Sequence, residues 1–141
     1  MAYWIIKTEP STYSFEQLCK DKKTSWDGVR NFQARNNLSS MSKGDVCFVY
    51  HSVGPKEIVG TAEVTRTAYP DLTATEGKWV AVEVKADEKL AHPVTLAQIK
   101  AHPQLVNMLL VRQGRLSVCP LTDEQAKIIL QMSKQGPRHA K

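Results

Sequence analysis

Cysteine is scarce in this sequence, and its few copies are widely separated. Only three of the 141 residues are cysteines, namely Cys19, Cys47 and Cys119. The count is odd and there is no CxxC pair, so neither a disulfide framework nor a zinc site is indicated. We therefore expect reduced thiols in an intracellular protein.

Long apolar segments are also missing. No run approaches the ~20 residues that a membrane-spanning helix needs. The N-terminus lacks the basic region, apolar stretch and small-residue cleavage site of a secretory signal, and the chain begins directly at its first predicted strand. We therefore expect a cytoplasmic protein that does not enter a membrane.

The motifs of several enzyme classes are absent as well. The sequence contains no GxSxG, no HExxH, no phosphate-binding loop and no glycine-rich dinucleotide fingerprint, so acyl transfer and nucleotide hydrolysis have no signature. The four histidines are scattered, at His51, His92, His102 and His139. From these residues we predict no catalytic group, no metal site and no cofactor.

Acidic residues are outnumbered by basic ones. Nineteen Lys and Arg face fourteen Asp and Glu, which gives a formal net charge of +5 and a pI of about 9.2. Such a field attracts phosphate and is compatible with a nucleic-acid partner. Charge alone does not establish one, because many basic proteins bind nothing acidic.

The remaining pattern predicts one α+β domain over residues 1–141. Apolar and β-branched runs predict strands at 2–7, 46–51, 57–67, 79–84 and 115–119. Capping boxes at Ser14, Thr95 and Thr122 predict short helices, a further helix is expected to begin at Pro103, and Gly136-Pro137 is expected to end the last one. Residues 24–43 are expected to form a loop with a short helix. Several strands without a βαβ rhythm favour a closed or nearly closed barrel.

One tryptophan lies in a stretch without strand or helix periodicity. The sequence WDGVRNFQARNNL places Trp26 beside many hydrogen-bonding side chains. A tryptophan in such a position is often a packed core residue, but an indole face also stacks on nucleobases, for roughly 1–3 kcal/mol per base. The neighbouring donors and acceptors suit base edges or phosphates; they are Arg30, Asn31, Gln33, Arg35, Asn36 and Asn37.

Two apolar strands end in polar side chains. Lys7, Thr8 and Glu9 follow the first strand, and His51 and Ser52 follow the second. Such ends are usually a solvated rim or a simple turn. If barrel closure brings them together, they line one mouth of the barrel, where small barrels commonly bind ligands.

These segments are similar, in order and spacing, to the EVE domain family. The resemblance runs nearly end to end and is carried by YWIIKTEPSTYSFEQL, WDGVRNFQARNNL, GDVCFVYHS, IVGTAEV, AYPD, KWVAVEV and RLSVCPLT. It implies a PUA-like mixed β pseudobarrel of about five to six strands with peripheral short helices. Relatives of that superfamily, the YTH, ASCH and PUA domains, handle nucleic acid.

The resemblance also implies a set of binding residues. Trp26 would form an aromatic wall of a base pocket, and Arg30 and Arg35 would meet backbone phosphates, although Arg35 has the alternative role of a buried strut. The other positions expected in or around the pocket are Lys7, Thr8, Glu9, Asn31, His51, Ser52, Tyr69, Asp71, Trp79 and Ser117.

We therefore interpret the chain as a non-catalytic, monomeric reader of a modified nucleobase. The family resemblance favours a 5-methylcytosine-type base in DNA, with RNA as an alternative partner. The competing hypothesis is a small ASCH-like amidohydrolase for modified nucleosides, in which Lys7, Thr8 and Glu9 supply a nucleophile and a proton carrier. A third possibility is a protein-interaction module whose barrel mouth is filled by side chains.

Overall fold

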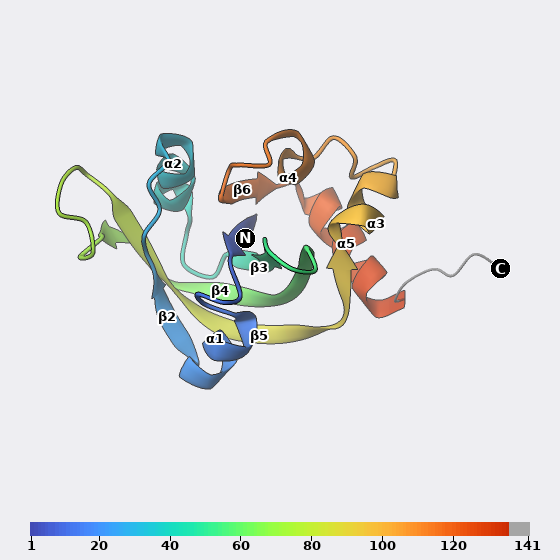
Figure 1. Cartoon of the computed structure of the whole chain (residues 1–141), viewed down its shortest axis with the longest axis horizontal. Coiled ribbons are helices and arrows are strands. Elements are labelled where there is room, and N and C mark those ends of the chain that lie inside the picture. The colour runs from blue at the N-terminus through green and yellow to red at the C-terminus, as the bar shows by residue number, and fades with distance from the viewer. Residues whose placement is uncertain (136–141) are drawn as a thin grey trace.

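A computed structural model describes residues 1–135, and the expected helix end at Gly136-Pro137 and His139 lie outside this range. Six strands and five helices follow one another in it (Figure 1). The strands are β1 (Tyr3–Thr8), β2 (Lys23–Trp26), β3 (Val46–His51), β4 (Glu57–Pro70), β5 (Val80–Thr95) and β6 (Val118–Leu121). The helices are α1 (Phe15–Asp21), α2 (Phe32–Ser40), α3 (Leu96–Ala101), α4 (Leu109–Arg112) and α5 (Asp123–Gln135).

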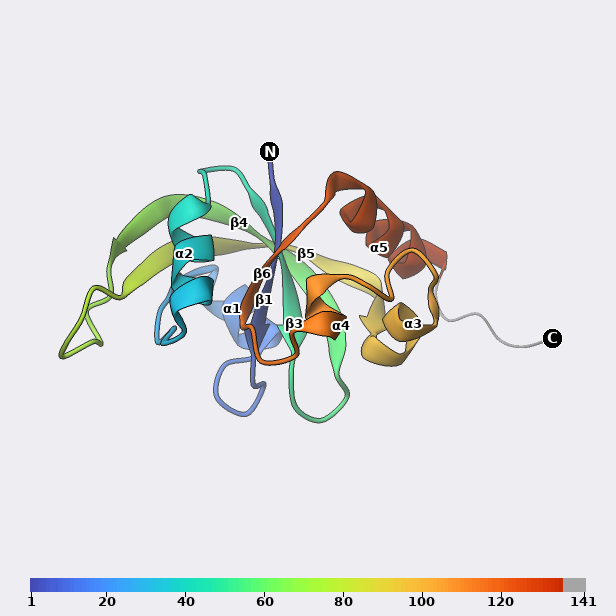
Figure 2. The same cartoon turned by 90° about the horizontal axis from the view of Figure 1, so that it is seen from above.

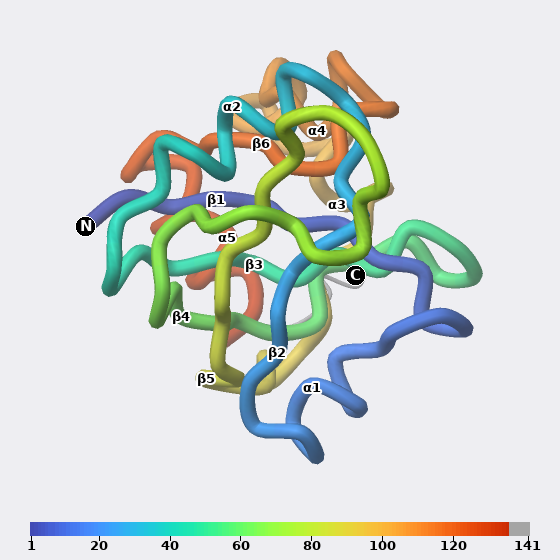
Figure 3. The backbone as a smooth tube through the Cα atoms, turned by 90° about the vertical axis from the view of Figure 1, so that its left-hand side faces the viewer, coloured from blue at the N-terminus to red at the C-terminus, as the bar shows by residue number. Residues whose placement is uncertain are grey.

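The strands form one mixed sheet in the order β2-β5-β4-β3-β1-β6. β1 and β3 are parallel, whereas the other neighbours are antiparallel. Figure 3 shows β1 lying between β6 and β3, and Figure 2 shows α2 at one end of the molecule with α3, α4 and α5 at the other. The predicted α+β, PUA-like architecture is confirmed, with six strands.

The core is built around the two parallel strands β1 and β3, each of which has a neighbouring strand on both sides. Their continuous apolar runs suit strands that are covered on both faces, and Ile5, Ile6, Phe48 and Val49 are fully buried. Asp45, just before β3, is buried. Its carboxylate tolerates burial because it accepts hydrogen bonds from the Trp4 indole and from two backbone N–H groups. This carboxylate holds the start of β1 beside the start of β3.

The expected elements differ from the observed ones at several places. β2 was not predicted, because a short edge strand with one neighbour needs no alternating pattern. β5 continues to Thr95, past the predicted end at residue 84, through register shifts against β4. β6 begins three residues later than predicted and ends at Leu121. The helix predicted from Pro103 is wrong: residues 103–107 form turns, and α4 begins at Leu109.

The capping signals locate helix starts more accurately. Thr95 and Gln98 form a reciprocal capping box at the start of α3, and Thr122 and Gln125 exchange the same two bonds before α5. The Ser14 hydroxyl accepts the Gln17 N–H at the start of α1. Within residues 1–135, no helix is long and apolar enough to cross a membrane.

Candidate functional site

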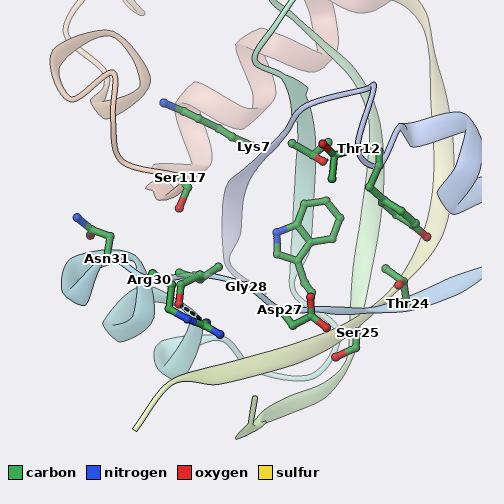
Figure 4. A pocket seen from close by; sticks show the side chains of 13 residues that line it. Lys7, Thr12, Thr24, Ser25, Asp27, Gly28, Arg30, Asn31 and Ser117 are labelled. Carbon is green, nitrogen blue, oxygen red and sulfur yellow. Dashed lines mark hydrogen bonds between the residues drawn. The ribbon is translucent and has the colours of Figure 1, made fainter. Parts of the chain in front are cut away.

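A cavity of about 620 Å³ opens between the edge strand β2 on one side and the end of β1, next to β6, on the other. We call it the Trp26 cavity. The end of β1 and the residue before β6 border it on one side, and β2 with the loop after it borders the other. Figure 4 shows the labelled side chains arranged around the opening. The lining residues are Lys7, Thr8, Thr12, Tyr13, Thr24, Ser25, Trp26, Asp27, Gly28, Val29, Arg30, Asn31 and Ser117.

Trp26 combines packing with a place on the cavity wall. It is the last residue of β2, pairs with Val82 of β5 and is 8% exposed. Its ring meets Tyr13 edge-on, with centroids 6.2 Å apart and an interplanar angle of 82°. In such a T-shaped pair the edge of one ring meets the face of the other, and Trp26 also lines the open cavity. The indole is therefore held rigidly beside a space of ligand size.

A buried carboxylate holds the loop that follows Trp26. The side chain of Asp71 is fully buried and accepts hydrogen bonds from the Gly28 N–H at 2.8 Å and the Arg30 guanidinium at 2.9 Å. Thr73 donates both its N–H and its hydroxyl to the other oxygen. Burial alone would raise the pKa of Asp71, but these hydrogen bonds outweigh it and hold the pKa well below its ordinary value. Gly28 has a positive φ of 76°, which the turn requires.

Asp27, unlike Asp71, presents its carboxylate to the Trp26 cavity. Its side chain forms no hydrogen bond to another residue in the described part of the chain. Although the residue as a whole is exposed, partial desolvation of the carboxylate, and then the negative charge of Asp71, raise its pKa above the ordinary value. The group is therefore an unused acceptor beside the indole.

The opposite wall carries three polar side chains, from Lys7 and Thr8 at the end of β1 and from Ser117 just before β6. The Lys7 backbone N–H donates to the Ser117 carbonyl, and the Lys7 ammonium donates to the Gly114 carbonyl, both at 2.9 Å. The Thr8 hydroxyl donates to the Tyr13 carbonyl at 2.7 Å. Burial lowers the pKa of Lys7. The Ser117 hydroxyl faces the cavity with no hydrogen bond to any of residues 1–135.

The structure places the other predicted strand-end residues outside this cavity. Glu9 is exposed, and its carbonyl closes the turn after β1. The His51 imidazole accepts the Phe15 N–H at 3.2 Å, and burial lowers its pKa, which favours the neutral ring that this bond needs. Ser52 pairs with Thr8 through its backbone and lines a second cavity.

Three more predicted residues line a separate hollow of about 500 Å³ between residues 68 and 80. We call it the Trp79 hollow. Tyr69 reaches back toward the first site, because its hydroxyl donates to Ser25 at 2.6 Å. Asp71 is the strut described above. Trp79 stacks on Phe32 with centroids 5.2 Å apart and an interplanar angle of 23°.

The two predicted phosphate-binding arginines both lie near the Trp79 ring. Arg30 lines the Trp26 cavity, pairs with Asp71 and lies 5.6 Å from the Trp79 ring, with its side chain 38% exposed. Arg35, on α2, is half-buried and lies over Phe32 at 5.0 Å and over Trp79 at 5.6 Å. Asn31 lines the cavity while its Oδ1 accepts the Ala34 N–H as the N-cap of α2.

Several lining residues were not among those singled out from the sequence. Asp27 follows Trp26 directly, so an acidic residue next to the candidate stacking ring was the available signal. Thr12 and Tyr13 carried no signal, because only the turn after β1 brings them back toward β2. Groups of three or more His, Cys, Asp or Glu that would suit a metal ion are absent from residues 1–135.

Sequence comparison gives relatives along nearly the full chain. Residues 2–132 match the EVE domain family. Thymocyte nuclear protein 1 of Homo sapiens is 33% identical over 171 residues, which span 96% of this chain and 76% of that protein.

Solved structures share the same fold. Rpa0253 from Rhodopseudomonas palustris is 45% identical, with a TM-score of 0.90 over 100% of this chain and 99% of that one. The human THYN1 protein, solved in complex with 5-methylcytosine-containing DNA, is 31% identical, with a TM-score of 0.90 over 97% and 100% of the two chains. These matches, with the family match over residues 2–132, establish that the chain belongs to the EVE domain family.

Proposed function

We propose that this protein reads a modified cytosine in nucleic acid by taking the flipped or single-stranded base into the Trp26 cavity. The observation that carries the proposal is the pairing of a rigid indole with hydrogen-bonding groups around one cavity of about 620 Å³. The relative solved with 5-methylcytosine-containing DNA supports the same ligand class.

Different residues around the cavity contact different parts of the nucleotide. The base stacks on Trp26, which offsets the few kcal/mol needed to unstack it from its neighbours. The Asp27 carboxylate accepts a hydrogen bond from the exocyclic amine, the group that distinguishes cytosine from thymine. Ser117 and the free amide N–H₂ of Asn31 bond the remaining polar edge. Arg30, partly exposed at the rim, meets a backbone phosphate.

We propose that this site binds its ligand without catalysing a reaction. The Thr8 hydroxyl donates to a backbone carbonyl rather than to a general base, and the Lys7 ammonium does the same. Neither group therefore has the hydrogen-bonded base that activates a nucleophile. Glu9 does not line the cavity, so the proton carrier of the amidohydrolase hypothesis is displaced from the proposed nucleophile.

The experiment is a titration of fluorescent oligonucleotides that contain one 5-methylcytosine or one cytosine at the same position. We expect wild type to favour the modified oligonucleotide, and Trp26→Ala to lose about 1–3 kcal/mol of binding, roughly 5- to 150-fold. Trp26→Phe should recover much of that loss, because it retains a stacking face. Circular dichroism and thermal unfolding of each variant separate lost binding from lost folding.

Two outcomes would contradict the proposal. Equal affinity of wild type and a folded Trp26→Ala for every oligonucleotide would exclude the indole as the stacking surface. Hydrolysis of an acylated cytidine by wild type, abolished in Lys7→Ala, would instead establish the amidohydrolase hypothesis.

A further inference from the structure

A second, smaller cavity of about 240 Å³ lies on the other side of Lys7. We call it the lysine cavity. The end of β3, the chain before β4, α3 and α4 surround it, and Lys7 lines both this cavity and the Trp26 cavity. The lining residues are Lys7, Tyr50, Ser52, Lys56, Leu96, Lys100, Leu110, Val111 and Gly114.

Three lysine side chains and no acidic residue line the lysine cavity. Lys7, Lys56 and Lys100 come from three different segments, and none of them forms an ion pair within residues 1–135. Burial is the main cause that lowers the pKa of Lys7; Cys119 acts against it, and the nearby positive charge of Lys56 lowers it further. Grouping like charges is unfavourable unless an anion binds between them.

A largely buried tyrosine also lines this cavity. Tyr50 is 3% exposed, and its hydroxyl has no hydrogen-bond partner among the described residues. Its ring lies 5.9 Å from the Lys7 ammonium. None of the described residues has a buried side-chain N or O atom without a partner, so the unpaired Tyr50 hydroxyl is open to the cavity and can donate to a ligand oxygen, independently of the lysines.

We propose that the lysine cavity binds one backbone phosphate of the strand whose base occupies the Trp26 cavity. The ligand's identity as nucleic acid rests on the proposed function. At about 240 Å³ the cavity is smaller than those that hold drug-sized ligands, and it suits a single tetrahedral anion. Lys56 and Lys100 contact the phosphate, and Lys7 separates it from the base. This phosphate contact lies on the opposite side of the base pocket from Arg30.

The experiment compares two double variants that lose the same charge. Lys56→Ala with Lys100→Ala alters the lysine cavity, whereas Lys89→Ala with Lys127→Ala removes two exposed lysines that line neither cavity. Each is titrated with methylated and unmethylated oligonucleotides at several salt concentrations. We expect the first variant to lose roughly tenfold in affinity for both oligonucleotides, and to lower the slope of log affinity against log salt by about 1.

Small ligands provide the second measurement. The nucleoside 5-methyldeoxycytidine and its 5′- and 3′-monophosphates are titrated by NMR. We expect one monophosphate to bind wild type more tightly than the nucleoside, and this gain to disappear in Lys56→Ala with Lys100→Ala. Unchanged nucleoside binding in that variant shows that the Trp26 cavity is intact.

The outcomes separate this proposal from the proposed function. A salt slope equal to that of the control variant, with methylation still distinguished, would overturn the phosphate site and leave the base reader standing. A lower slope, with no effect of Trp26→Ala, would support the phosphate site and contradict the base reader.

Discussion

Trp26 and Trp79 were both predicted to contact a base, yet the fold gives them different surroundings. Trp26 ends an edge strand, touches Tyr13 edge-on and lines a cavity. Trp79 is stacked on Phe32, and two guanidinium groups lie 5.6 Å from its ring. Phe32 therefore occupies a face of Trp79 that a base would otherwise use. The proposed function therefore assigns the base to Trp26, whereas Trp79 supports the two arginines.

The largest effect is expected at Asp71, which connects the Trp79 hollow to the Trp26 cavity. Asp71 lies in the Trp79 hollow but holds Gly28 and Arg30, which line the Trp26 cavity. Asp71→Ala leaves a buried N–H and a guanidinium without their acceptor, so we expect a loss of roughly 2–4 kcal/mol in the free energy of unfolding. Urea denaturation at pH 7 measures it, and a loss below 1 kcal/mol would contradict the role of a strut.

The pH dependence of stability gives the same strut a second test. Because the folded-state pKa of Asp71 lies below the ordinary 3.8, its ionised form stabilises the fold at every pH above 3.8. That contribution is lost as the pH falls below 3.8 and through the folded-state pKa. The difference in unfolding free energy between wild type and Asp71→Ala should therefore shrink between pH 5 and pH 2. A constant difference would exclude the charge as the cause.

A smaller effect is expected at Asp27, which sharpens the comparison within the Trp26 cavity. Asp27→Asn retains size but replaces a charged acceptor with a neutral amide. We expect about 1 kcal/mol weaker binding of a cytosine-type base, roughly fivefold. Binding of a thymine at the same position should weaken less, because its O4 accepts a bond from the new amide. Parallel titrations of the two oligonucleotides measure the change in preference.

The raised pKa of Asp27 predicts how this binding responds to acid. Because the pKa of Asp27 lies above the ordinary 3.8, its carboxylate takes up a proton at a higher pH than an ordinary aspartate does. The protonated form is a poorer acceptor. Wild-type affinity should therefore fall as the pH is lowered from 7 toward 4. Asp27→Asn provides the control, since any titration of the base itself is common to both proteins. Identical pH profiles would mean that Asp27 does not contact the base.

The sequence predicted which residues line the Trp26 cavity better than it predicted how they are arranged in space. Lys7 and Thr8 were identifiable because polar residues end an apolar strand, and Trp26 because it interrupts an amide-rich stretch. The same reasoning placed His51 in the site, where it instead caps the start of α1. It also omitted Asp27. Local patterns locate strand ends, but which ends meet depends on sheet order and on a four-residue edge strand without a pattern of its own.

The smallest expected effect belongs to Trp79, and it decides whether the two tryptophans truly differ. Trp79→Ala removes the surface that Arg30 and Arg35 lie against, so the arginines lose part of their orientation. Exposed cation–π contacts contribute about 0.5–1 kcal/mol, so we expect a two- to fivefold loss that is equal for methylated and unmethylated oligonucleotides. Trp26→Ala should instead reduce the preference between them. If Trp79→Ala erased that preference in a folded protein, Trp79 would be part of the base-reading surface, because support for a phosphate contact carries no information about the base.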